Sequence, residues 1–150
     1  MVSTRSRPMV FALLLVVAFL AVPPVSAKDD AGYTVCPSVF DAPEMIQRLA
    51  DTIEQGETNR HQFYVESGAE CLEVHLNWYS TSESLALTLY APSWSEIGTY
   101  HDNDDGVKDG KIHIDIVPDS SHVDQGIWTF DVYGDRVSSQ RTYNLNLYQH

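Results

Sequence analysis

Residues 71–93 read CLEVHLNWYSTSESLALTLYAPS, and two parts of this stretch carry an apolar residue at every second position. The first part alternates from Leu72 to Trp78, and the second alternates from Leu85 to Leu89. Successive side chains of a β-strand point to opposite faces, so each part has one apolar face and one polar face. The pattern predicts strands of a sheet that packs on one side and meets water on the other.

The same two-residue period continues through most of the chain. It recurs near residues 61–66, 112–116, 128–132 and 143–147. Residues typical of turns separate these runs at Gly68, Pro92–Ser93, Asp105–Gly106, Asp109–Gly110 and Gly134–Asp135. Six or more short antiparallel strands without long helical segments predict an all-β domain, either a sandwich or a barrel.

A mixed segment, residues 28–50, precedes the expected sandwich domain at residues 51–150, and we interpret it as an N-terminal arm. A short strand is expected at Tyr33–Cys36. A short helix or helical turn is expected at Glu44–Ala50, because apolar residues recur there at helical spacing and a proline suits the first turn. The residues concerned are Pro43, Met45, Ile46, Leu49 and Ile53.

The first 27 residues have the features of a secretory signal peptide. Arg5 and Arg7 precede an apolar run of 14 residues from Met9 to Val22, and small residues close the segment at Ala27. A membrane-spanning helix needs roughly 20 residues, so we expect cleavage after Ala27 rather than a retained anchor. The sequence therefore predicts a secreted, extracellular protein with no membrane span after cleavage.

The net charge of the chain limits the classes of partner that we expect it to bind. The whole chain has a formal net charge of −12, and loss of the two arginines of the signal peptide brings it to −14. Nucleic acids and anionic membranes would repel such a protein, so we expect neither as a partner. Cations, cationic partners and a well-solvated surface all remain compatible with this charge.

Several stretches together resemble the bacterial and archaeal pre-peptidase C-terminal domain. They are TIEQGETNRHQFYV (52–65), residues 71–93, DDGVKDGKIHIDIV (104–117) and QGIWTFDVYGDRVSSQRTYNLNLY (125–148). The resemblance implies a jelly-roll-like antiparallel β-sandwich that is not catalytic and that usually accompanies secreted peptidases or other extracellular enzymes. It also implies that calcium or a polymeric substrate is bound in some members. Ser84 and Ala86 stand where the family often carries aspartate, so no metal role transfers to those positions.

Four carboxylates lie within eight residues, at Asp102, Asp104, Asp105 and Asp109. Calcium prefers six to eight oxygen ligands, and an acidic loop interrupted by glycine supplies several of them. The spacing does not fit an EF-hand loop, so the expected site is a calcium loop of another kind. The alternative interpretation is a solvated turn rich in Asp and Gly.

Cys36 and Cys71 are the only cysteines. In an oxidising compartment an even pair predicts a disulfide, which would contribute about 3–4 kcal/mol in the chain-entropy model. Trp94 and Tyr100 are the candidate binding residues, because exposed aromatic side chains stack on sugars or pack against proteins. The alternative for Trp94 is that it closes one end of the core.

No Gly-x-Ser-x-Gly motif and no zinc-binding histidine pattern occurs in the chain. We therefore expect no enzyme but a secreted binding or accessory module for an extracellular polysaccharide, protein, cell surface or secreted peptidase. One alternative is a small hydrolase, which would need His75, His101 or His113 bonded to both a serine and an aspartate. A histidine and aspartate metal site and a structural role in the cell envelope are further alternatives.

Overall fold

The computed structural model describes residues 32–40 and 47–150, which form nine β-strands and no helix. In chain order they are β1 (Tyr33–Pro37), β2 (Gln47–Ile53), β3 (Thr58–Val65), β4 (Leu72–Asn77), β5 (Ser84–Tyr90), β6 (Glu96–His101), β7 (Lys111–Pro118), β8 (Gly126–Arg136) and β9 (Arg141–Gln149). None of the described residues belongs to a helix long and apolar enough to cross a membrane. The signal peptide predicted at residues 1–27 lies outside the described residues.

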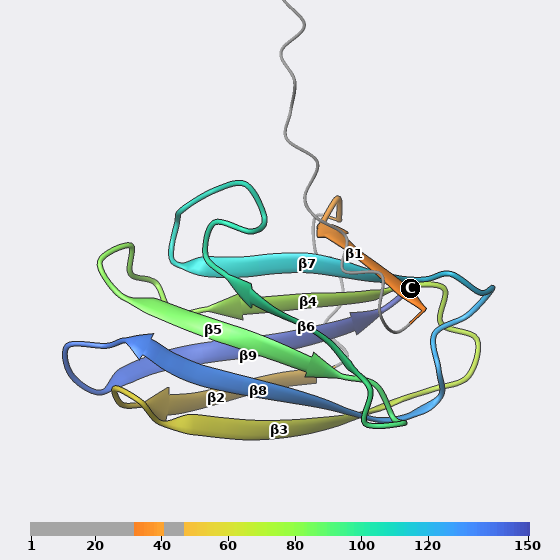
Figure 1. Cartoon of the computed structure of the whole chain (residues 1–150), viewed down its shortest axis with the longest axis horizontal. Helices are drawn as coiled ribbons and strands as arrows, with labels where there is room; N and C mark the ends of the chain where they lie inside the picture. Colours follow the sequence, from red (N-terminus) through yellow and green to blue (C-terminus); the bar gives the residue numbers. More distant parts are fainter. Residues whose placement is uncertain (1–31, 41–46) are drawn as a thin grey trace, which may run out of the picture.

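The strands form two antiparallel sheets that pack face to face (Figure 1). One sheet has five strands in the order β1-β7-β4-β9-β2, and the other has four in the order β3-β8-β5-β6. All the strand pairs run antiparallel. The predicted all-β sandwich is therefore confirmed, and the alternative of a closed barrel is not what forms.

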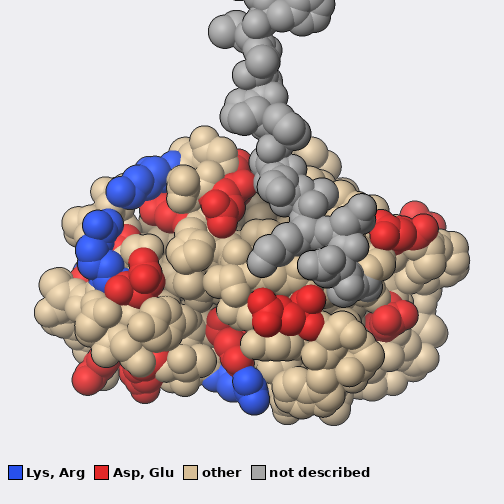
Figure 2. All heavy atoms as spheres, in the orientation of Figure 1, with Lys and Arg blue, Asp and Glu red and all other residues tan. Residues whose placement is uncertain are grey.

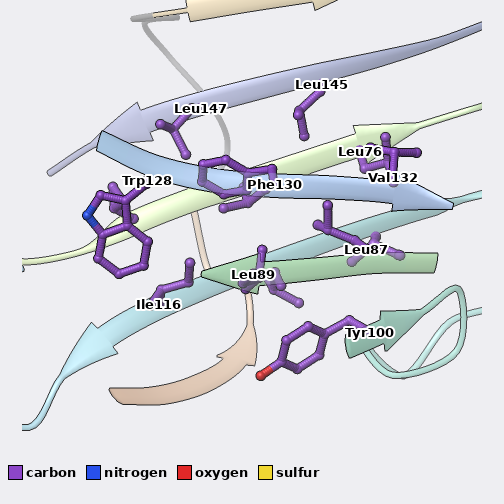
Figure 3. Close-up of a cluster of buried hydrophobic side chains, with 14 of the residues drawn as sticks. Leu76, Leu87, Leu89, Tyr100, Ile116, Trp128, Phe130, Val132, Leu145 and Leu147 are labelled. Carbon is purple, nitrogen blue, oxygen red and sulfur yellow. The ribbon is translucent and has the colours of Figure 1, made fainter. Parts of the chain in front are cut away.

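The alternating apolar residues meet between the two sheets. Trp128, Phe130 and Val132 of β8 are fully buried and face leucines of the opposite sheet (Figure 3). Because the period of a strand is two, the residues between them in the sequence must lie on the outer side of the sheet. The sequence pattern therefore places Ile127, Thr129, Asp131 and Tyr133 together on one outer face.

The helical turn expected at Glu44–Ala50 is wrong over the part that the structure describes. Residues 47–50 belong to β2, which forms a continuous ladder with β9 and pairs Leu49 with Leu145. Leu49 and Ile53 are four residues apart, so they share a face in a strand as well as in a helix. As a strand, β2 pairs its backbone with that of β9, and Ile53 is fully buried. Both observations favour the strand over the helical turn.

Candidate functional site

The outer face of the four-stranded sheet carries a regular array of polar and aromatic side chains. Strand register places Arg60 opposite Asp131, Asp131 opposite Thr88, and Thr88 opposite Thr99. A second row in the same register places Gln62 opposite Thr129 and Thr129 opposite Tyr90. Tyr64 and Ile127 lie at one end of the array, and Tyr133 lies at the other. We call this array the outer face, and it comprises Arg60, Gln62, Tyr64, Thr88, Tyr90, Thr99, Ile127, Thr129, Asp131 and Tyr133.

A bidentate ion pair lies at the centre of the outer face. Arg60 donates from Nε to Asp131 Oδ1 at 2.7 Å and from an Nη atom to Asp131 Oδ2 at 2.6 Å. The hydrogen bonds and the charge of Asp131 raise the pKa of Arg60 above its ordinary value. Paired guanidinium and carboxylate groups of this geometry fix each other's orientation. Arg60 is thereby held against the sheet with its positive charge balanced.

Trp94 comes from the β5–β6 connection and lies beside this ion pair. Its indole is 57% exposed, with the guanidinium carbon of Arg60 5.5 Å from the ring centroid. The ring centroid of Tyr90 lies 6.2 Å from that of Trp94. A cation over an indole and a neighbouring aromatic ring both hold the side chain in place. The structure thus presents Trp94 to solvent in a supported position, as an exposed aromatic rather than a lid on the core.

The backbone at Trp94 is in the left-handed region, with φ of 66°. The Trp94 N–H donates to the carbonyl of Ala91 at 2.9 Å, which closes a tight turn. A non-glycine residue in this conformation costs of the order of 1–3 kcal/mol. The surrounding contacts therefore hold a large exposed side chain at a position that glycine would occupy more easily.

Tyr100 does not share this surface. It is only 8% exposed and lies among the core side chains (Figure 3), where burial raises the pKa of its hydroxyl to about 12. Strand β6 pairs Tyr100 with Leu87, whose side chain points inward, so the pleat turns Tyr100 inward as well. The prediction that Tyr100 and Trp94 form one binding surface is wrong.

The residues of the outer face were missed at the level of the sequence, and of this region only Trp94 was named. Arg60 and Asp131 are 71 positions apart, and no local motif links them. A signal was present at Ile127 and Tyr133, because both are apolar or aromatic at positions where the alternation predicts a solvated polar residue. Both side chains are exposed in the structure, Ile127 at 52% and Tyr133 at 39%.

The carboxylates of the acidic loop bond to nearby backbone. Asp102 Oδ1 accepts from the N–H groups of Asp109 and Gly110 at 3.0 Å each, and Asp104 accepts from the N–H of His101 at 2.8 Å. Asp105 accepts from two further N–H groups, while burial raises the pKa of its carboxyl above the ordinary value. Over the described parts of the chain, no three His, Cys, Asp or Glu side chains are arranged to hold a metal ion.

Beside the acidic loop lies a hollow of about 420 Å³. It opens where β5 begins and β8 ends. Its lining carries both signs of charge and comprises Ser84, His101, Asp102, Asn103, Asp104, Lys108, Asp135 and Arg136. The hollow is therefore lined by polar and charged side chains from the acidic loop and from the ends of β5 and β8.

The expected disulfide is not formed, and Cys36 and Cys71 are free. Cys36 pairs with Asp115 of β7, whereas Cys71 precedes β4 on the other side of β7. Two strand spacings amount to roughly 9.6 Å, and a disulfide needs Cα atoms within about 7 Å. Burial raises the pKa of both thiols, that of Cys71 to about 12.

Histidines gather on the outside of the five-stranded sheet. Glu73 is fully buried, and its two carboxylate oxygens lie 2.6 Å from His113 Nε2 and 2.8 Å from His150 Nε2. His75 stacks on His113 with ring centroids 4.7 Å apart, and burial lowers the pKa of His75 to about 4. These contacts make a polar cluster centred on a buried carboxylate.

The histidines that the hydrolase alternative requires have other neighbours. His113 contacts Glu73, and His101 lies near Asp104. In the described residues, the serine and histidine side chains that do bond each other are Ser121 and His122, which are adjacent and exposed. The Ser, His and Asp arrangement named for that alternative is not among these contacts.

Comparison with known proteins gives a fold likeness. No family model matches the chain, and no curated protein matches it. Among solved structures, the Clostridium perfringens CspB protease is similar with a TM-score of 0.52 at 10% sequence identity. The match covers 67% of this chain but 25% of that protease, so the likeness concerns the fold of one part of it.

Proposed function

We propose that this chain is an exported, non-catalytic binding module and that its ligand binds on the outer face around Trp94. Support for export comes from the signal-like segment that ends at Ala27. Support for an accessory role comes from the sequence resemblance to pre-peptidase C-terminal domains and from the fold likeness to part of a protease. The ligand class that fits these observations is an extracellular polymer or surface.

The observation that carries the proposal is the exposure of Trp94 in a left-handed backbone conformation. An exposed indole forgoes the roughly 1.5–3 kcal/mol that burial of a large apolar side chain contributes to folding. The conformation adds a further cost, and a glycine would avoid both. Because Arg60 and Tyr90 nevertheless hold the ring in place, the arrangement favours binding over stability.

Calcium bound by the acidic loop is a second part of the proposal. Asp102 Oδ2 and Asp109 Oδ1 are buried and have no hydrogen-bond partner among the described residues. A buried carboxylate oxygen without a partner carries a desolvation cost, and a cation would relieve it. The ion would stabilise the loop beside the outer face and would take no part in catalysis.

The test replaces Trp94 by glycine and measures retention of the protein on insoluble cellulose, chitin, collagen and bacterial cell walls. Tyr79→Gly is the matched control, because Tyr79 is also exposed and also has positive φ, at 57°. We expect the wild type and Tyr79→Gly to be retained alike and Trp94→Gly to be released, with its melting temperature unchanged or raised. Equal retention of all three proteins would reject the proposed surface.

A further inference from the structure

We propose that the ligand is an elongated, uncharged polysaccharide that lies along β8 and contacts Tyr64, Trp94 and Tyr133 in succession. This inference rests on the proposed function and names the chemical class of its ligand. It follows from three properties of the outer face: the spacing of its aromatic side chains, the polar groups between them, and its charge.

The three aromatic side chains mark a line along one strand. Tyr64 pairs with Ile127 near the start of β8, and Tyr133 lies six residues further along the same strand. Six residues of a strand span roughly 20 Å. Trp94 falls between these ends, because it lies over Arg60, the partner of Asp131.

All three rings are accessible at once. Tyr64 is 51% exposed and Tyr133 is 39% exposed, and both belong to the outward side of the sheet, as does the exposed Trp94. A compact ligand would contact one of these rings, whereas an extended chain would contact all three. The spacing therefore favours a linear polymer with repeated units.

Hydroxyl and amide groups flank the line of rings. Gln62 is exposed on β3 between Tyr64 and Arg60. Thr88 and Thr99 lie on the neighbouring strands β5 and β6, whereas Thr129 is buried. Thr88 Oγ1 lies 2.8 Å from Thr99 Oγ1, and Gln62 donates to Thr129 Oγ1 at 3.4 Å. Each hydroxyl both donates and accepts hydrogen bonds. A sugar unit has apolar C–H groups on its ring faces and hydroxyls at its edge, so alternating aromatic and hydroxyl side chains complement it.

The charge of the protein favours an uncharged polysaccharide as ligand over a negatively charged one. The positive charge of Arg60 is balanced by Asp131, and the chain as a whole carries −12. Figure 2 shows basic side chains in small groups among acidic ones on the visible face. A sulfated or uronic acid polymer would meet a protein of net negative charge on which Arg60 is already paired with Asp131. An uncharged polymer meets no such barrier.

The test is electrophoresis of the purified protein, expressed from the whole sequence, in native gels that contain a soluble polysaccharide. The uncharged probes are hydroxyethyl cellulose, glucomannan, xyloglucan and glycol chitin, and the polyanionic probes are polygalacturonate and heparin. We expect at least one uncharged probe to slow the wild type and the Tyr79→Gly control, and the polyanions to slow neither. Absence of retardation by every uncharged probe, or retardation by the polyanions alone, would overturn the inference.

Substitutions of Tyr64 and Tyr133, at the two ends of the line of rings, test whether the ligand lies along β8. Tyr64→Ala and Tyr133→Ala should each weaken binding roughly two- to tenfold, the range expected for loss of one aromatic contact. Each loss should be measurable with a six-unit oligosaccharide of the retarding polymer and absent with a two-unit one, because the short ligand cannot reach both ends. Equal effects on both lengths, or no effect of either substitution, would contradict a ligand lying along β8.

Failure of this inference differs from failure of the proposed function. If no uncharged polysaccharide binds but collagen or cell walls retain the protein in a manner that Trp94→Gly abolishes, the ligand class is wrong and the surface is right. If retention on every material survives Trp94→Gly, the proposed surface itself is wrong.

Discussion

Acidification from pH 7 to pH 5 should destabilise this fold through His75. Burial, reinforced by the neighbouring His113, lowers the pKa of the His75 imidazole to about 4, against 6.5 for the unfolded chain. The unfolded state therefore binds more protons between these two values, and stability falls as the pH falls through that window. Linkage at pH 5 gives a loss of about 1–2 kcal/mol relative to pH 7, once partial solvent screening is included.

The perturbation that isolates this effect is His75→Phe, measured by urea unfolding at pH 7 and pH 5. Phenylalanine keeps a ring to stack on His113, and the Nε2 of His75 has no partner among the described residues to lose. The pH-dependent loss of unfolding free energy should shrink by about 1–2 kcal/mol in this variant. Substitution of the exposed His122 by Asn is the control and should leave the loss unchanged. An identical pH dependence in His75→Phe and wild type would refute the reasoning.

Three further predictions concern stability and the cysteines. Millimolar calcium, compared with EDTA and with magnesium, should raise the melting temperature by about 8–13 °C if the ion is at a hundredfold excess over its dissociation constant; no calcium-selective shift would leave Asp102 and its neighbours as a solvated loop. Cys36 and Cys71 should react with a thiol reagent as two free thiols in denaturant and slowly in the native protein, since burial raises both pKa values; a protein without titratable thiols in denaturant would contradict the free-cysteine structure. Tyr100→Ala should cost about 3 kcal/mol of unfolding free energy in a denaturant titration, because it leaves a cavity in the core; a neutral effect would contradict its burial.

The sandwich could be predicted because its signal is local and repeated. Each run, such as Leu72 to Trp78, carries its own alternation, and an inward-facing strand must bury that face whatever its partner is. The exception is β2, where Leu49 and Ile53 satisfy both the helical and the strand period. The pairing of β2 with β9 joins residues nearly a hundred positions apart, and the amino acids of β2 alone do not encode it.

The candidate site could be predicted only in part. Trp94 was identifiable as an aromatic residue in a connection, and the structure places it in solvent. Tyr100 was predicted to be exposed, but it belongs to the short strand β6, whose pleat turns it into the core. The contact of Arg60 with Asp131 depends on strand register across the sheet, which a single sequence does not specify.

Tryptophan fluorescence offers the most direct measurement on the outer face. The chain has three tryptophans, of which Trp78 and Trp128 are fully buried and Trp94 is exposed, so acrylamide should quench the emission of Trp94 selectively. We predict that a saturating amount of the soluble polymer that retards the protein abolishes this quenchable fraction, and that Trp94→Gly lacks it from the start. If the polymer binds while Trp94 stays as quenchable as before, the ligand lies elsewhere and the outer face is not the binding surface.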